Sequence, residues 1–355
     1  MKILNNTIAA ISPQSNTWRE RARERLDQLT MPHWALGRIM DLAVDLAGMT
    51  RSLQPATRHK VIVVMAADHG VVAEGVTQYP QDVTWQMVTN FVDEGAGINA
   101  LAGQVGADVR VVDMGVAGNL EDFARTEAIL SLPVAPGTAN MAKGPAMTRE
   151  QAILSVENGI RVARRMIDEN YDLIGVGEMG IGNTTPSSAI IATLSGESVE
   201  AVTGHGTGID EERRQHKIAV IEKALRINHA DPQDGLDVLA KLGGFEIGGI
   251  AGVILGAAAG QRPVLVDGLI SSAGALIARQ LAPNVADYLI AAHRGVERGH
   301  GIALAQLGKE PLLDLQLRLG EGTGAALAMN LVEAAGRVLQ EVKTFAKARV
   351  SSQVQ

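Results

Sequence analysis

The chain contains no cysteine among its 355 residues, and aromatic side chains make up only 3% of it. Without cysteine there is no disulfide, thiolate nucleophile, cysteine-ligated zinc or iron–sulfur cluster, which fits a cytoplasmic enzyme. Because aromatic residues are so few, alanine and the other aliphatic side chains must build most of the core. The net charge is −7 and lysine and arginine form no block, so nucleic acid is not expected as a partner.

Long apolar runs are missing as well. The longest uncharged apolar stretch, between Glu246 and Gln261, is shorter than the roughly 20 residues that a bilayer-spanning helix needs. Residues 1–13 lack the apolar core and cleavage site of a signal peptide. We therefore expect a soluble protein without a membrane partner. A hydrophobic fraction of 46% is ample for one large domain.

Glycine, by contrast, is in excess, with 39 residues in 355, or about 11% against a usual value of roughly 7%. The surplus of about 14 is local: ten glycines lie in residues 175–182, 204–208 and 320–324, and six in 243–256. The 243–256 stretch is typical of a closely packed buried helix. The loops 204–208 and 320–324 share the pattern G-x-G-T-G, and each precedes an expected helix. Each loop is either a backbone nest that binds an anion or a flexible connection with a capping threonine.

Five β-branched runs predict strands buried on both faces, because their hydrophobicity is continuous rather than alternating. They occupy residues 61–64, 109–112, 173–176, 264–266 and 288–290. Helical patterns lie between or beside them at 149–168, 184–194, 211–228 and 232–242, with further helices expected at 17–29, 38–47 and 324–346. The alternation predicts an α/β fold, a Rossmann-like, mostly parallel sheet flanked by helices. The two termini are expected to form a small helical domain.

Ligands of open parallel sheets bind beyond the carboxyl ends of the strands. Each predicted strand carries a polar candidate there; these are His69, Asp113, Glu178, Asp267 and His293. Any one of them could be only a turn former or a buried, satisfied side chain. A metal held by Asp68, His69, Asp113 and Asp267 is a weak alternative, and the chain contains no common metal or nucleophile motif.

Residues 175–180 match G-x-G-x-x-G, the dinucleotide fingerprint. We discount an NAD site because Glu178 would face and repel the pyrophosphate. The alternative is a loop of N–H groups and hydroxyls that leads into the helix at 184–194, whose N-terminus suits one phosphate.

Glu321 is the strongest candidate for a catalytic residue. It is a carboxylate with glycine on each side, at the start of an expected helix. A dry pocket would raise the pKa of its carboxyl group and make it a better base. A helix-capping role is the competing interpretation.

Taken together, these segments resemble the nicotinate-nucleotide–dimethylbenzimidazole phosphoribosyltransferase family over nearly the whole chain. The matching stretches, in order, are 67–71 (ADHGV), 74–76 (EGV), 175–186 (GVGEMGIGNTTP), 234–235 (DG), 243–246 (GGFE), 266–268 (VDG) and 318–326 (RLGEGTGAA). Their combination and order are far more specific than any single loop.

The resemblance implies transfer of the phosphoribosyl group of nicotinate mononucleotide to 5,6-dimethylbenzimidazole, with inversion at C1′, in cobalamin nucleotide-loop assembly. It implies Glu321 as general base and Glu178 as the second catalytic glutamate, no metal or cofactor, and a homodimer whose sites are completed across the interface, with Lys217 a candidate to act there. The implied phosphate and ribose ligands are Gly177, Gly180, Asn183, Thr184, Thr185, Gly204 and Lys217. The implied base pocket is Tyr79, Pro80, Gln86, Met87 and Leu319, although Trp85, Met87 and Leu319 could equally be core residues.

The chain departs from the family near its start, where the familiar Lys-Pro-Pro-Gly-Ser-Leu-Gly-Arg is replaced by MPHWALGR at residues 31–38. Ala292-His293 likewise replaces a common Ser-His pair. The acceptor could therefore be adenine, another benzimidazole or a phenol, and a non-catalytic nucleotide-binding relative is a further alternative. We expect a large α/β domain at 56–295, a small helical domain from 1–55 plus 296–355, and a contribution of the 318–324 loop to the active site.

Overall fold

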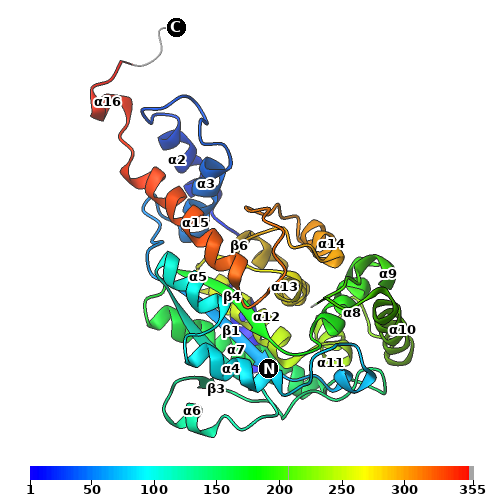
Figure 1. The fold of residues 1–355 in the computed structure, drawn as a ribbon. Helices are drawn as coiled ribbons and strands as arrows, with labels where there is room; N and C mark the ends of the chain where they lie inside the picture. The colour runs from blue at the N-terminus through cyan, green and yellow to red at the C-terminus, as the bar shows by residue number, and fades with distance from the viewer. Residues whose placement is uncertain (207, 352–355) are drawn as a thin grey trace.

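The computed structural model describes residues 1–206 and 208–351, which fold around one six-stranded sheet (Figure 1). All strands are parallel, in the order β3-β2-β1-β4-β5-β6. They are β1 (Lys60–Ala67), β2 (Ala107–Gly115), β3 (Leu130–Ser131), β4 (Leu173–Met179), β5 (Val264–Val266) and β6 (Leu289–Ala291). This order is the Rossmann order, so the predicted fold class is confirmed.

The strands form where the β-branched runs predict them. Every residue of the central strand β1 is buried, as expected for a strand covered on both faces. Only the two-residue edge strand β3 lacks a run of its own and is missed by the sequence. The carboxyl ends of β4, β5 and β6 lead directly to Glu178, Asp267 and His293, so the topology brings these three residues to one edge.

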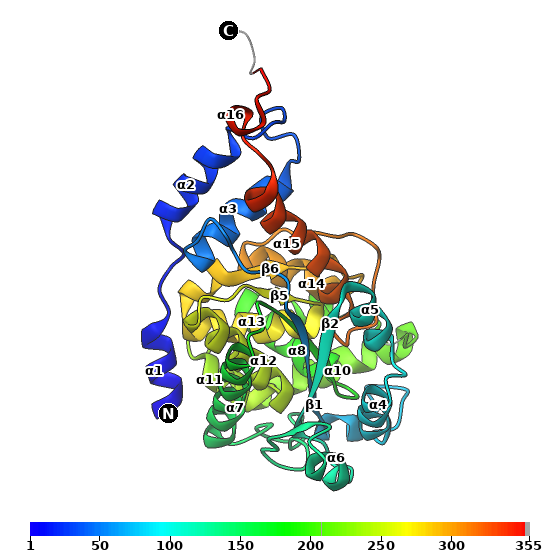
Figure 2. The same ribbon diagram turned by 90° about the vertical axis from the view of Figure 1, so that its left-hand side faces the viewer.

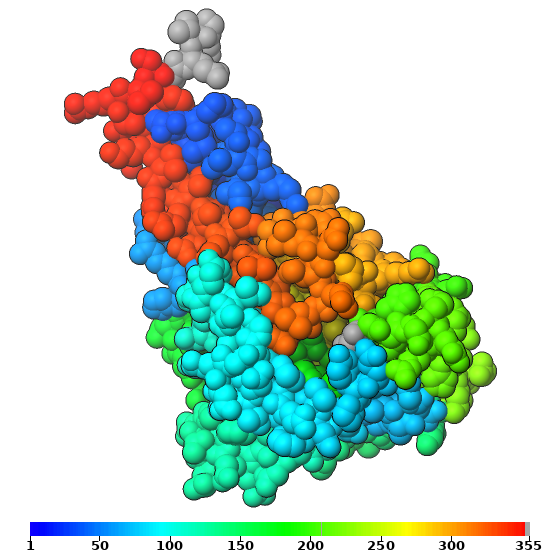
Figure 3. All heavy atoms as spheres, viewed as in Figure 1, coloured from blue at the N-terminus to red at the C-terminus, as the bar shows by residue number. Residues whose placement is uncertain are grey.

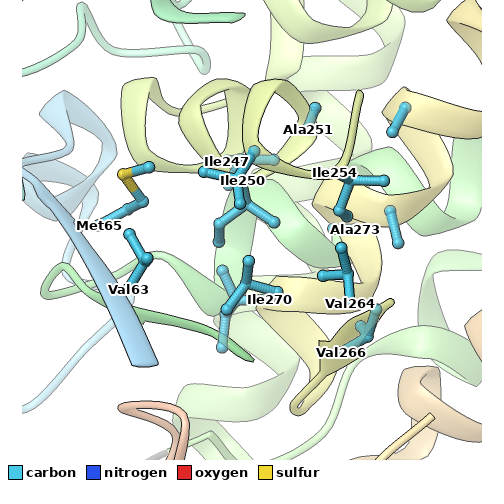
Figure 4. Packing of buried hydrophobic residues seen from close by; sticks show 14 of the residues in the cluster. Val63, Met65, Ile247, Ile250, Ala251, Ile254, Val264, Val266, Ile270 and Ala273 are labelled. Atoms are coloured by element: carbon cyan, nitrogen blue, oxygen red, sulfur yellow. The ribbon is translucent and has the colours of Figure 1, made fainter. Parts of the chain in front are cut away.

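Helices cover both faces of the sheet (Figures 1 and 2). On one face α12 (Phe245–Ala259) and α13 (Leu269–Leu281) lie against the strands, and α7 (Arg149–Asp168) packs behind α12. On the other face α15 (Thr323–Glu341) lies against β1, β4 and β5, with α5 (Gly97–Val105) beside it over β2. A close-up shows Val63 and Met65 of β1 and Val264 of β5 beside isoleucines of α12 (Figure 4).

The glycines of α12 allow two helices to pack with backbones in contact, as the sequence predicts for residues 243–256. A Cβ atom built on Gly252 would lie 2.0 Å from the carbonyl oxygen of Val156 in α7. One built on Gly159 of α7 would lie 2.0 Å from the carbonyl oxygen of Gly249. Glycine is required on both helices because any side chain would push them apart.

The remaining helices between β1 and the C-terminal segment connect and flank these layers. They are α4 (Val83–Val92), α6 (Glu121–Arg125), α8 (Thr184–Ser195), α9 (Val199–Val202), α10 (Glu211–Asn228), α11 (Gly235–Leu242), α14 (Arg298–Leu307) and the 3₁₀ helices η1 (Gly70–Glu74) and η2 (Pro283–Tyr288). Predicted helices at 149–168 and 211–228 coincide with α7 and α10. The predicted helix at 324–346 is instead α15 followed, after an extended residue at Val342, by the short helix α16 (Phe345–Ala348).

Helices from the first fifty residues and from the last thirty-five pack together at one end of the molecule, although the N-terminus itself lies elsewhere, at α1 (Figure 2). Helices α2 (Asn16–Leu26) and α3 (Arg38–Thr50) pack against α15, and the Arg25 guanidinium donates to the carbonyls of Leu339, Gln340 and Val342. We propose that these helices with α16 form the small helical domain. Helix α1 (Lys2–Ala10) packs instead on α7 and α12, and α14 packs on α8, α9 and α13. Residues 352–355 of the expected domain lie outside the described part of the chain.

Within residues 1–206 and 208–351, no helix is both long and apolar enough to cross a membrane.

Replacing Gly252 by alanine tests the α7–α12 contact. We expect G252A to lower the free energy of unfolding by roughly 1–3 kcal/mol, because the new methyl group overpacks the interface. The control is G103A in α5, where nothing lies within 4 Å of an added Cβ and alanine should stabilise by about 0.5–1 kcal/mol. Denaturant midpoints at equal protein concentration measure both, and equal effects of the two variants would contradict the packing argument.

Candidate active site

A cavity of about 720 Å³ opens at the carboxyl edge of the sheet. In the space-filling view it is the hollow between the light-blue segment near residue 77, the green segment near 205 and the orange segment near 318 (Figure 3). It lies beyond β4, β5 and β6. Nine of the predicted site residues line it: Tyr79, Met87, Glu178, Gly180, Asn183, Thr184, Lys217, Leu319 and Glu321.

Glu321 lies in the turn that starts α15, in the left-handed conformation with φ 61°. Its side chain is 6% exposed, and one carboxylate oxygen accepts a hydrogen bond from the Ile98 N–H at the start of α5, at 3.0 Å. Burial raises the pKa of Glu321, the Ile98 hydrogen bond lowers it, and the charge of Asp267 raises it further, with a net rise. Glu321 lines the cavity, as a base that acts on a bound substrate must.

Asp267, the residue after β5, holds the Glu321 turn in place. One of its carboxylate oxygens accepts from the Gly322 N–H at 3.2 Å and the other from the Ala325 N–H at 3.0 Å. Gly177 of β4 supports the same turn, because a Cβ atom there would lie 2.2 Å from the carbonyl oxygen of Glu321. The position of Glu321 is therefore set by two strands rather than by its own loop.

Glu178, the last residue but one of β4, also lines the cavity and is 7% exposed. The Asn183 side-chain amide donates a hydrogen bond to its carboxylate. Burial raises the pKa of Glu178 to about 8, opposed by the Asn183 hydrogen bond and reinforced by the negative charges of Asp267, Glu246 and Glu321. In the empty cavity at neutral pH Glu178 is therefore mostly a neutral acid.

The opposite end of the cavity is cationic. Lys217 reaches in from α10 and is 2% exposed, and its ammonium donates to the Thr184 hydroxyl at 2.6 Å, at the first residue of α8. Burial lowers the pKa of Lys217 to about 8, although the charge of Glu297 opposes the fall. A helix N-terminus, a hydroxyl and an ammonium in one place suit one phosphate group. Lys217 lines the cavity of its own chain, and a role across an interface stays a prediction.

A third part of the cavity wall is largely apolar. Tyr79, Met87 and Leu319 line it together with Val76 and Val83. Tyr79 is 44% and Leu319 60% exposed, so this wall opens to solvent. Flat, apolar surfaces of this kind suit an aromatic ring.

The cavity does not bring together every predicted residue. Pro80, Gln86 and Trp85 are exposed and are not among the described lining residues, which also do not include Gly177, Thr185 and Gly204. Gly177 meets the Glu321 backbone, and a Cβ atom on Gly204 would lie 1.9 Å from a carboxylate oxygen of Glu297. Thr207, in the loop at 204–208, lies outside the described residues.

Two strand-end candidates turn away from the cavity. His69 lies 2.9 Å from the carboxylate of Glu246, and both side chains are buried. The Asp113 carboxylate accepts from the N–H groups of Gly115 and Val116 and closes a turn. In the described part of the chain, no group of three or more His, Asp and Glu side chains is arranged to hold a metal ion.

Sequence reasoning missed three contributors to the site. Glu297 and His300 line the cavity from the start of α14, and the Ile98 N–H orients Glu321. The Ile98 N–H could not be predicted because a backbone donor does not depend on the residue type. Glu297 and His300 were missed because neither belongs to a motif. Arg318, part of the motif at 318–326, also lines the cavity without having been assigned a role.

Comparison with known proteins places this geometry in a family. A sequence model described as Phosphoribosyltransferase matches residues 11–350. The nicotinate-nucleotide–dimethylbenzimidazole phosphoribosyltransferase of Syntrophotalea carbinolica is 61% identical over 351 residues, which is 99% of both chains. The protein of the same name from Desulfotalea psychrophila is 54% identical, again over 99% of both. The crystal structure of CobT from Thermus thermophilus superposes with a TM-score of 0.91 at 46% identity, covering 95% of this chain and 100% of that one.

The chain belongs to the nicotinate-nucleotide–dimethylbenzimidazole phosphoribosyltransferase family. The resemblance found in the sequence is thereby confirmed. So is the prediction that the chain is an enzyme, a pentosyltransferase. The division of roles among the site residues remains a prediction, developed below.

The cationic end of the cavity makes a pH-dependent prediction about this family member. A phosphate ester binds the protonated form of Lys217, and the pKa of Lys217 lies at about 8 in the empty cavity. We therefore expect the Kd for ribose 5-phosphate, measured by calorimetry, to be nearly flat between pH 7 and 8, above the second pKa of the phosphate at about 6. Above pH 8 the Kd should rise by up to about tenfold per pH unit.

The variant K217M should bind weakly at every pH and lose this dependence. The control K143M removes a lysine that is 67% exposed and should leave it intact. A K217M variant that binds ribose 5-phosphate as tightly as the wild type would show that Lys217 does not bind the phosphate.

Proposed function

We propose that the enzyme transfers the phosphoribosyl group of nicotinate mononucleotide to 5,6-dimethylbenzimidazole, giving α-ribazole 5′-phosphate and nicotinate for cobalamin nucleotide-loop assembly. The observation that carries this proposal is one cavity with two buried carboxylates at one end and a buried ammonium at the other. Glu321 and Glu178 suit chemistry at a ribose C1′ and at an acceptor nitrogen, and Lys217 suits the 5′-phosphate. The family and the names of its members support the same reaction.

Glu321 acts as the general base in this proposal. The benzimidazole attacks C1′ with one ring nitrogen while its other nitrogen gives up a proton, and the raised pKa of Glu321 makes its carboxylate a stronger acceptor for that proton. Attack from the face opposite the leaving pyridine inverts C1′ and converts the β-nucleotide into the α-product. The ring nitrogen of nicotinate leaves without needing a proton, so no acid is required on that side.

Glu178 responds to charge on the substrate. Its carboxyl group is neutral in the empty cavity because burial disfavours the anion. The positive pyridinium of the bound nucleotide, and then the positive charge that develops on the ribose, favour the ionised form. The Asn183 amide already donates toward that form. An interaction that strengthens as the ribose becomes cationic stabilises the transition state more than the ground state.

The nucleotide is anchored by its phosphate at the start of α8. The Thr184 hydroxyl, the N-terminus of α8 and Lys217 supply donors without making the whole protein basic. The N–H groups of Ile181, Asn183 and Thr185 already donate within the chain. Because the cavity extends from this anchor to the glutamates, the ribose lies between them. Orientation of C1′ is thus obtained from the end of the substrate that does not react.

The acceptor could also be a different base. The wall formed by Tyr79, Met87 and Leu319 is open and apolar, and Glu321 is the group with a clear polar function toward the acceptor. Such a wall restricts the shape of a ring more than its pattern of polar groups. Adenine, another benzimidazole or a phenol therefore remains an alternative acceptor, and for a phenol Glu321 would remove a proton from oxygen.

A panel of bases tests the reaction. Nicotinate mononucleotide incubated with 5,6-dimethylbenzimidazole should release nicotinate and yield α-ribazole 5′-phosphate, whose anomeric configuration NMR establishes. The rates of nicotinate release with adenine, unsubstituted benzimidazole and a phenol rank these compounds as alternative acceptors. Absence of nicotinate release with every base would refute the proposed reaction, leaving a non-catalytic nucleotide-binding role.

The general-base role has its own test. E321Q keeps the shape of the side chain, and kcat should fall about 100-fold to 10,000-fold with little change in KM for the nucleotide. The matched control E310Q alters an exposed glutamate and should behave as wild type. Full turnover by E321Q would mean that another group takes the proton.

We also infer a cytoplasmic homodimer. The large apolar side chains Leu315, Leu319 and Tyr79 are 55%, 60% and 44% exposed, and Leu319 and Tyr79 stand at the wall of the cavity. Exposed apolar groups at a site are expected to be covered, and a second copy of the chain would complete the open wall. Sedimentation velocity should give the mass of two chains, and a purely monomeric species at micromolar concentration would refute the inference.

A further inference from the structure

Three buried polar side chains lie in a row beside the Glu321 turn, and two of them, His293 and His300, line the cavity without a role in the reaction proposed above. Asp267 follows β5, His293 follows β6 and His300 lies in the first turn of α14. The Nε2 atom of His293 is 3.5 Å from a carboxylate oxygen of Asp267, and the rings of His293 and His300 meet edge to face with centroids 5.5 Å apart. All three side chains are at least nine-tenths buried.

The geometry settles which imidazole carries the charge. The Nδ1 atom of His300 accepts a hydrogen bond from the Gly295 N–H at 2.9 Å, so this nitrogen is not protonated. Burial, with the adjacent His293, lowers the pKa of His300 to about 4. Burial also opposes charge on His293, but the hydrogen bond and the negative charge of Asp267 outweigh it and raise the pKa of His293 above its ordinary 6.5.

Asp267 is the charged neighbour that both glutamates share. Its negative charge raises the pKa of Glu321 and that of Glu178. It also holds the Glu321 turn through the Gly322 and Ala325 N–H groups, and His293 packs on that same turn, where a Cβ atom on Gly324 would lie 2.0 Å from its ring. A change in the charge of His293 is therefore felt by Glu321 through Asp267, which contacts His293 and holds the Glu321 turn.

We propose that His293 is a positioning residue for the transfer reaction, an imidazolium counter-ion that neutralises Asp267 and thereby keeps Glu321 ionised as the base in mildly acidic solution. The charged or titratable groups facing this unit are Glu321 from the start of α15, Glu178 from β4, His300 from α14 and Arg294, the next residue in the chain. Of these, His300 is neutral and Arg294 is exposed. The inference rests on the proposed function because it assigns Glu321 the role of base.

The decisive measurement is the acid limb of kcat against pH, which reports ionisation in the enzyme–substrate complex. In H293Q the charge of Asp267 is no longer compensated, so protonation of Glu321 becomes easier and the limb moves to higher pH. The ratio of kcat at pH 6 to kcat at pH 8 should fall roughly threefold to tenfold against wild type. D267N removes the charge itself, so its limb should move to lower pH. Because the amide oxygen can accept only one of the two N–H bonds from the Glu321 turn, kcat should also fall, and the pH of the limb rather than the size of kcat is the readout.

The double variant D267N/H293Q distinguishes this electrostatic role from a structural one. If His293 acts through the charge of Asp267, H293Q should shift nothing further once Asp267 is already neutral. The control is H33Q, because His33 forms an exposed pair with Asp27 at 3.1 Å and should not move the profile. Single variants that lower kcat equally at all pH values would overturn the proposal.

A measurement independent of turnover accompanies the kinetics. The His293 imidazole signal in proton NMR, assigned by its loss in H293Q, should titrate above pH 6.5 in the wild type and below 6.5 in D267N. A His293 midpoint unaffected by D267N would overturn the pairing. If the wild type released no nicotinate, the proposed function would fall while this titration still decided whether Asp267 and His293 are coupled.

Discussion

The whole site depends on how Asp267 binds the first turn of α15. Both of its carboxylate oxygens are engaged by backbone N–H groups, and hydrogen bonds to a charged group are each worth about 1.5–3 kcal/mol. The left-handed conformation of Glu321 costs roughly 1–2 kcal/mol, so the two bonds outweigh the strain. Gly177 adds a steric condition, since only a residue without a side chain lets the Glu321 carbonyl approach β4 so closely. A strained carboxylate thus stays in one place because the sheet, not the loop, holds it.

Burial then gives the cavity its electrostatic character. The same desolvation that raises the pKa of Glu178 to about 8 lowers that of Lys217 to about 8, so each group is brought toward its neutral form when the cavity is empty. In the proposed binding mode the phosphate of the nucleotide meets Lys217 and its pyridinium meets Glu178, and each charge favours ionisation of the group it meets. Lys217 is already mostly protonated at neutral pH, so in this proposal the change on binding is the ionisation of Glu178.

Much of this could be predicted from the sequence, and the failures have physical reasons. Continuous β-branched runs identify the buried strands, whereas β3 is two residues long and leaves no pattern. Glu321, Glu178 and Lys217 were identified by chemical type together with the resemblance, and the fold brings them into one cavity. The Ile98 N–H could not be identified, because every residue except proline carries a backbone N–H. Helix α1 was missed because it has only nine residues, interrupted by the polar Asn5-Asn6-Thr7, and only Leu4 and Thr7 of it are buried.

The glycine pattern at 175–180 illustrates why residue type alone underdetermines function. Gly175 and Gly177 lie inside β4 rather than in a loop, and alternate residues of a strand face the same side. On that side stands α15, with Met329 near Gly175 and the Glu321 backbone against Gly177. Glu178 falls on the opposite side at the strand end, from which its carboxylate reaches the cavity. The glycines of a dinucleotide fingerprint allow a pyrophosphate to approach the backbone. Here the same spacing allows the first turn of α15 to approach the backbone of β4, and that turn carries Glu321.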